Sequence, residues 1–121
     1  MTPQEVYAML SGISENVEVT YYRFLDTAAQ PAPAPPFICY WYPSSDDFFA
    51  DNANYQLVSE LAIELYTDFK DLALEAQVEA ALTDHELAWE KEETYLDDQR
   101  MHMTTWTTEV VLTSNGGNVN A

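Results

Sequence analysis

The chain is poor in basic residues and in glycine, and each scarcity excludes a class of protein. Four lysines and arginines stand against 21 aspartates and glutamates among 121 residues, a formal net charge of −17. Nucleic acid binding depends on cations that neutralise phosphates, so groove or backbone binding is disfavoured. The three glycines, Gly12, Gly116 and Gly117, cannot form a phosphate loop or a dinucleotide fingerprint.

Cysteine and long apolar runs are equally scarce. Cys39 is the only cysteine, so no internal disulfide can form and a reducing compartment is expected. Its apolar surroundings favour a buried small side chain over a nucleophile. No apolar run has the length of a membrane span, and the start MTPQEVYAML lacks the basic residues of a signal peptide. We expect a soluble protein made in the cytoplasm, with no membrane partner.

The sequence contains no motif for catalysis, for a metal or for a cofactor. His85-Glu86 begins like the zinc-protease motif, but Trp89 stands where its second histidine is required. The stretch 46–54 lacks the glycine and the closing glutamate of an EF-hand loop. Neighbouring carboxylates are frequent, yet in so acidic a chain such pairs arise by chance. We predict no catalytic residue, no metal site, no cofactor and no enzymatic activity.

The periodicity of apolar residues predicts one domain with two helices and five strands. Thr2 to Glu5 form a capping box for a first helix that ends near Gly12, and Asp71 can cap the second. The expected strands are 17–24, 37–42, 55–67, 87–95 and 101–112, and the second helix is 72–82. This α-β-β-β-α-β-β order predicts an α+β fold, a mostly antiparallel four- to five-stranded sheet with two helices packed on it.

The domain is expected to span residues 1–112, followed by a flexible tail at 113–121. Within it, the Pro/Ala-rich stretch 26–36 cannot form regular structure. Two interpretations stay open for this stretch: a linker between strands, or an arm that reaches along a neighbouring subunit. On the second helix, Leu74, Val78 and Leu82 form the apolar stripe, and Glu75 and Glu79 are expected to point away from it.

The stretch after Pro43 is an unusual mixture of aromatic and acidic residues. We expect a loop here, because Pro43 ends the preceding strand and the sequence SSDDFFADNANY is too polar for a core. Two adjacent phenylalanines in such a loop indicate either a partner surface or a small satellite core under the loop. The candidate interface residues are Phe48, Phe49, Asp46, Asp47 and Asp51.

The negative charge itself allows three interpretations. It can be a solubilising surface without a further role. It can be a surface that must not adhere to DNA, such as the wall of a DNA conduit. It can also imitate DNA and occupy a basic groove of another protein.

The ordered segments PPFICYWYPSSDDFFADNANY, ELAIELYTDFKD and WEKEETYLDDQRMHMTTWTTEVVL resemble the tail completion (tail terminator) proteins of long-tailed siphophages. The likeness extends over roughly residues 3–112, and the features typical of the family map to Pro35-Pro36, 37–42, 48–52, 64–71 and 89–96. Family members are often richer in lysine, so the acidity is a departure. The Pro/Ala-rich stretch is a second variable point.

This resemblance implies a virion protein of the head–tail junction, assembled in the host cytoplasm. Its subunits would form a homo-oligomer, a hexameric ring on the head-proximal end of the tail tube. The ring would stop tube growth, contact the tail tube protein and join the tail to a head completion or connector protein. DNA would pass through without specific binding.

In such a ring, an acidic lumen would repel DNA phosphates. We expect Glu60, Glu64, Glu90 and Glu92, on outward strand faces, to contribute to that negative potential. Two alternatives stay open: a neighbouring head–tail connector or stopper ring, and an acidic DNA mimic that inhibits a DNA-binding protein.

Overall fold

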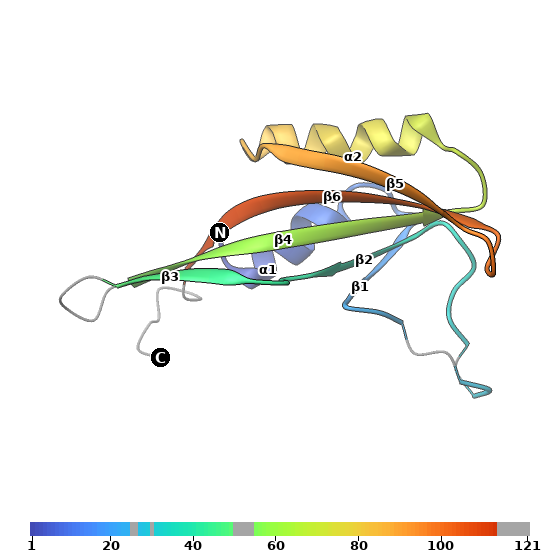
Figure 1. The fold of residues 1–121 in the computed structure, drawn as a ribbon, viewed down its shortest axis with the longest axis horizontal. Coiled ribbons are helices and arrows are strands. Elements are labelled where there is room, and N and C mark those ends of the chain that lie inside the picture. Colours follow the sequence, from blue (N-terminus) through green and yellow to red (C-terminus); the bar gives the residue numbers. More distant parts are fainter. Residues whose placement is uncertain (25–26, 30, 50–54, 114–121) are drawn as a thin grey trace.

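The long strand β4 (Tyr55–Thr67) is the central strand of a twisted sheet (Figure 1). The computed structural model describes residues 1–24, 27–29, 31–49 and 55–113. These residues form two helices and six strands. The remaining elements are α1 (Pro3–Ser11), β1 (Glu18–Tyr21), β2 (Phe37–Trp41), β3 (Ser45–Phe49), α2 (Leu72–Asp84), β5 (Trp89–Leu96) and β6 (Met101–Leu112).

The strands follow the order β1-β2-β4-β6-β5, and β3 pairs with β4. Only β1 and β2 run parallel; every other pair is antiparallel. β2 and β3 follow one another along the same edge of β4, interrupted around Pro43, which has no N–H to donate. The chain is therefore an α+β domain with a five-stranded, mostly antiparallel mixed sheet when β2 and β3 are taken as one interrupted strand. This confirms the predicted fold class.

The expected caps begin both helices. The hydroxyl of Thr2 accepts from the Glu5 amide, and the Glu5 carboxylate accepts from the Thr2 amide. Asp71 accepts from the Leu74 amide at 3.1 Å. Each cap satisfies N–H groups that the first turn of a helix leaves unpaired.

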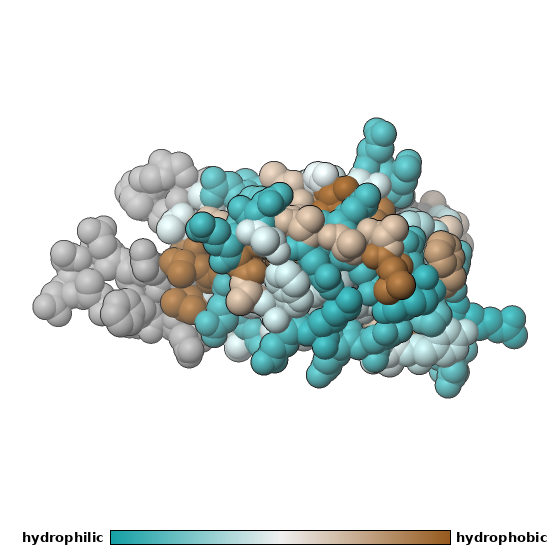
Figure 2. Space-filling view, turned by 90° about the horizontal axis from the view of Figure 1, so that it is seen from above, coloured by the Kyte–Doolittle hydropathy of each residue, from teal (hydrophilic) through white to brown (hydrophobic). Residues whose placement is uncertain are grey.

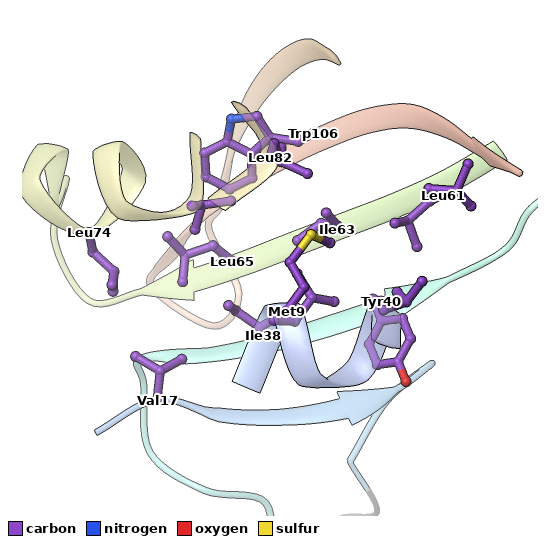
Figure 3. Close-up of a cluster of buried hydrophobic side chains, with 14 residues drawn as sticks. Met9, Val17, Ile38, Tyr40, Leu61, Ile63, Leu65, Leu74, Leu82 and Trp106 are labelled. Atoms are coloured by element: carbon purple, nitrogen blue, oxygen red, sulfur yellow. The ribbon is translucent and has the colours of Figure 1, made fainter. Parts of the chain in front are cut away.

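Both helices pack on one face of the sheet, and the core lies between them and the strands (Figure 3). Met9 of α1 and Leu82 of α2 face Leu65, Ile63 and Trp106 of the sheet. Because side chains alternate along a strand, the buried row on β4 leaves its other row on the uncovered face.

The first strand is shorter than its sequence predicts. We expected residues 17–24, but β1 ends at Tyr21 because Tyr22 adopts a left-handed φ of 71° and turns the chain away. The Tyr22 amide donates to the Tyr40 carbonyl at 2.6 Å. Beyond the turn, residues 27–29 and 31–36 form no helix or strand, as predicted. The predicted tail lies outside the described residues from 114 onward.

Candidate functional site: the acidic sheet face

The four glutamates predicted to act together lie on the same face of the sheet. Glu60 and Glu64 alternate with the buried Leu61, Ile63 and Leu65, which pack toward the helices. Glu90 and Glu92 flank Lys91, whose ammonium group contacts helix α2. All four carboxylates therefore belong to the face that the helices leave uncovered.

The strand register brings a fifth carboxylate to this face. Glu109 of β6 pairs directly with Glu60 of β4. Thr105 lies between Glu64 on one side and Glu92 on the other. We name Glu60, Glu64, Glu90, Glu92 and Glu109 the acidic face. Sequence reasoning missed Glu109, although it shares the alternation of residues 101–112 with Thr105 and Thr107.

No lysine or arginine of the described strands lies on the acidic face. Lys91 is the one cation in these strands, and it is engaged on the helix side. Two hydroxyl groups do reach the face. Ser44 donates to Glu60 at 3.2 Å, and Tyr66 donates to Glu64 at 2.9 Å. These bonds orient two carboxylates but leave their negative charge in place.

Glu64 also raises the pKa of two neighbouring groups, the Cys39 thiol and the Tyr66 hydroxyl. Burial raises the pKa of the Cys39 thiol to about 11, and the charge of Glu64 adds to this effect. Burial likewise raises the pKa of Tyr66, supported by its hydrogen bond to Glu64. Cys39 is 4 % exposed, so the expectation of a buried side chain is confirmed.

A hollow of about 610 Å³ opens at the end of the acidic face where β5 begins. It is lined by Glu60, Glu90, Glu109, Glu86 and the half-buried Trp89, among others. Nearby, the Thr108 hydroxyl donates to the Ala88 carbonyl and fixes the entry to β5. The described residues contain no group of three His, Cys, Asp or Glu side chains placed to hold a metal ion.

The prediction that Glu75 and Glu79 point away from the core is wrong. Glu75 is 3 % exposed and contacts the ammonium groups of Lys70 and Lys91 at 2.8 and 3.0 Å. It also accepts from Thr104, and Glu79 accepts from the indole N–H of Trp106 at 3.0 Å. These carboxylates face the sheet because half of the chain's four cations lie opposite them.

This ion cluster lowers the pKa of Glu75 and raises the pKa of both lysines. Burial alone would raise the pKa of Glu75, but hydrogen bonds from Lys70 and Lys91 outweigh it. The pKa of Lys91 rises through its bonds to Glu79 and Glu75. The cluster is a structural clamp between α2 and the sheet, and it leaves the acidic face without these two cations.

The stretch that we expected to be a loop is partly a strand. Asp46, Asp47, Phe48 and Phe49 belong to β3, where Phe48 pairs with Gln56 of β4. The prediction failed because Pro43 interrupts the ladder without ending it, and the Glu60 amide still donates to the Ser44 carbonyl at 2.8 Å. Asp51 lies outside the described residues. The assignment of these residues to an interface stays a prediction.

The surface over α2 differs from the acidic face. Figure 2 shows it as mostly hydrophilic, with small hydrophobic patches separated by polar side chains. Phe69 and Leu72 at the start of α2 are 62 % and 67 % exposed. Neither described helix is long and apolar enough to cross a membrane.

Compared with known proteins, the chain matches no protein-family model and no curated protein sequence.

Proposed function

We propose that the chain is a structural virion protein, a tail terminator that forms a ring on the head-proximal end of a phage tail tube. In this ring the acidic face lines the passage for DNA. The partners are further copies of the chain, the tail tube protein and a head completion or connector protein. The proposal combines the resemblance of the sequence with the acidic face, and the acidic face is the observation that carries it.

The spacing of the carboxylates supports a role as a repelling wall. Neighbouring strands lie about 4.8 Å apart, so Glu64 and Glu92, two strands apart, are separated by roughly 10 Å. The Debye length at physiological ionic strength is about 8 Å. The fields of these charges overlap, so a passing phosphate meets a continuous negative potential. Because no lysine or arginine of the described strands lies on this face, a DNA phosphate finds no cation there to bind.

The first test is electron microscopy of phage lysates that lack this chain. The proposal predicts tails that are overlong or that have no head attached. Normal particles would contradict it. If the purified chain instead binds a basic host protein as a monomer or dimer, the DNA-mimic alternative is correct.

A second test distinguishes the effect of the acidic face from the effect of the chain's total negative charge. One variant replaces the five glutamates of the acidic face by glutamine. A control variant neutralises five exposed carboxylates elsewhere: Glu15, Asp68, Asp84, Asp97 and Asp98. Both variants have the same net charge. The proposal predicts that both complete tails, and that only the face variant loses infectivity. Equal infectivity of the two would contradict a role of the face in DNA passage.

A further inference from the structure

The sheet has two open edges, formed by β1 and β5. These strands lie at the two ends of the order β1-β2-β4-β6-β5, so no described strand pairs with the outer side of either one (Figure 1). Strand β5 is eight residues long, and its residues from Glu90 to Tyr95 are exposed. An open edge presents backbone N–H and C=O groups that can pair with a strand of another chain. The chain therefore has two backbone surfaces available to a partner.

The side chains that commonly keep an edge strand unpaired are missing or engaged here. Free lysines and prolines are two such devices. Strand β1 contains neither, and the single lysine of β5, Lys91, contacts Glu75 and Glu79 of α2 at 3.0 and 2.8 Å. Glu93 of β5 is likewise paired with Lys70 at 2.8 Å. On the helix side of β5, the described charges are thus occupied within their own copy.

The directions of the two edge strands suit an antiparallel pair between copies. Strand β1 is parallel to β2, and the directions then alternate through β4, β6 and β5. Strand β5 therefore runs opposite to β1. Copies around a ring axis that follows the strands keep their directions, so β5 of one copy meets β1 of the next in antiparallel orientation. Because the two edges are different surfaces, the contact is head-to-tail and can close into a ring.

Each edge also carries a half-exposed tyrosine on the helix side of the sheet. Tyr21 of β1 lies opposite Tyr40, and Tyr95 of β5 lies opposite His102, in rows that continue the buried row of β4. Tyr21 and Tyr95 are 52 % and 49 % exposed. Their rings are held in place by Tyr40 and His102, with ring centres 5.3 and 4.9 Å apart. Such positioned tyrosines are typical anchors of protein interfaces.

We propose that β5 of one copy pairs with β1 of the next, so that the sheets of neighbouring copies join into one continuous sheet. When residues of the same face lie opposite one another, all helices stay on one side and all acidic faces on the other. Closing the ring then leaves no open edge. The inference rests on the proposed function only for self-association into a ring, and it names the contact between the copies.

The side chains of the two strands favour one register. In it, Thr20 lies opposite Thr94 on the acidic side, and Val19 lies opposite Tyr95 on the helix side. Tyr21 then lies diagonal to Tyr95, within reach of an aromatic ring. Threonine pairs and pairs of an aromatic with a β-branched residue stabilise neighbouring antiparallel strands.

The other registers that pair all of β1 with β5 and keep the faces aligned bring carboxylates together. A shift by two residues sets Thr20 opposite Glu92 and leaves Glu18 diagonal to Glu92. A shift by four residues sets Glu18 directly opposite Glu92, and like charges in that position destabilise a strand pair. The Thr20–Thr94 register avoids both arrangements.

Disulfide cross-linking between variants tests the pairing and the register. Thr20→Cys and Thr94→Cys are made separately in a Cys39→Ala chain, mixed at millimolar concentration and oxidised. The proposal predicts a linked species of twice the 13.8 kDa chain mass. The matched control replaces Thr94→Cys by Asp84→Cys, an exposed position on α2. Because pairing holds the two thiols together, the Thr20–Thr94 link should form about tenfold faster or more than the control link.

A chain that carries both cysteines, Thr20→Cys and Thr94→Cys, tests the head-to-tail order. Within one copy the two positions are four strand spacings of about 4.8 Å apart, and a disulfide requires Cα atoms within about 7 Å. Every bridge must therefore join two copies. We expect a ladder of linked species that ends at the closed ring.

The variant Tyr21→Thr with Tyr95→Thr tests the two anchors. Threonine suits a strand, so the fold should be kept. Self-association measured by sedimentation should weaken about tenfold or more, as is common for central interface aromatics. The control Tyr7→Gln changes a tyrosine of α1 that is 47 % exposed, and it should have no effect.

Three results would overturn the proposal: a Thr20–Thr94 link no faster than the control link, faster linkage of Thr20→Cys to Glu92→Cys, and equal association of the tyrosine double variant and Tyr7→Gln. The proposed function fails separately. Overlong or headless tails in lysates that lack the chain, together with absent cross-linking, would support that function and reject this contact. Cross-linking of the purified chain together with normal particles would do the reverse.

Discussion

Replacing Glu75 by glutamine is expected to weaken the attachment of helix α2 to the sheet. The carboxylate is buried and contacts Lys70, Lys91 and the Thr104 hydroxyl. Glutamine keeps the shape and its oxygen can still accept from Thr104, but its NH2 group then faces the ammonium groups that donate to Oε1 of Glu75. The change therefore removes the ion pairs with both lysines. The Lys70→Met and Lys91→Met double variant is the complementary change, because methionine keeps most of the lysine stem and leaves Glu75 as a buried, unpaired charge.

The structure predicts different magnitudes for the two changes. Both ammonium groups are about one-third exposed, at 35 %, so water screens them and each pair contributes no more than about 1 kcal/mol. Glu75→Gln should therefore lower the free energy of unfolding by at most about 2 kcal/mol. Removing both lysines should cost about 3–5 kcal/mol, because the buried carboxylate then has no counterion.

The pH dependence follows from the shifted pKa values. The pKa of Glu75 is lowered in the folded chain, so its stabilisation is present above the unfolded pKa of about 4.3 and is lost as the pH falls through the folded pKa. The pKa values of Lys70 and Lys91 are raised, so their stabilisation is present below about 10.4 and is lost as the pH rises further. The cost of Glu75→Gln should be constant near neutral pH and shrink in acid.

Urea unfolding followed by tryptophan fluorescence and circular dichroism measures these values. Asp84→Asn, an exposed change on the same helix, should stay within about 0.5 kcal/mol of the original chain. Adding Glu75→Gln to the double lysine variant should restore part of the lost stability. If the effects of the three substitutions on the free energy of unfolding are additive, the carboxylate and the lysines do not interact as described. The same holds if Glu75→Gln lowers the free energy of unfolding more than the loss of both lysines does.

Three further outcomes follow from the structure. Phe48→Ala with Phe49→Ala should leave a folded monomer by circular dichroism and block tail assembly; an unfolded variant would place the pair in the core. Neutralising the acidic face should raise the melting temperature at low salt and weaken its salt dependence, since like charges on neighbouring strands repel one another; an unchanged salt profile would argue against this repulsion. The Cys39 thiol should resist alkylation at neutral pH until the chain unfolds; rapid labelling of the folded chain would contradict its burial.

Strand β4 shows how much of the fold the sequence contains. Its alternation of apolar and polar residues predicts both the bounds 55–67 and the direction of Leu61, Ile63, Glu60 and Glu64. Period-two alternation determines the face of a side chain without any tertiary information. The acidic face was therefore predictable in outline from strands β4 and β5.

Glu75 and Tyr22 show where local pattern is insufficient. A glutamate between apolar helix positions resembles a solvent-facing residue until Lys70 and Lys91 are placed beside it, and both lysines come from other elements. Tyr22 has high strand propensity, but its left-handed backbone ends β1 and exposes the ring. The burial of Glu75 and the end of β1 both depend on residues that are distant in the sequence. A single sequence does not show which distant residues come into contact. The same holds for β3, whose pairing with β4 resumes after Pro43.

Cryo-electron microscopy of the head-proximal tail end would show whether this chain forms a ring there and which of its faces lines the DNA passage. We expect a ring of this chain on the last layer of the tube, with Glu60, Glu64, Glu90, Glu92 and Glu109 turned toward the DNA. A ring with these glutamates on its outer rim would contradict the role of the acidic face. A tail end without this chain would contradict the proposed function as a whole.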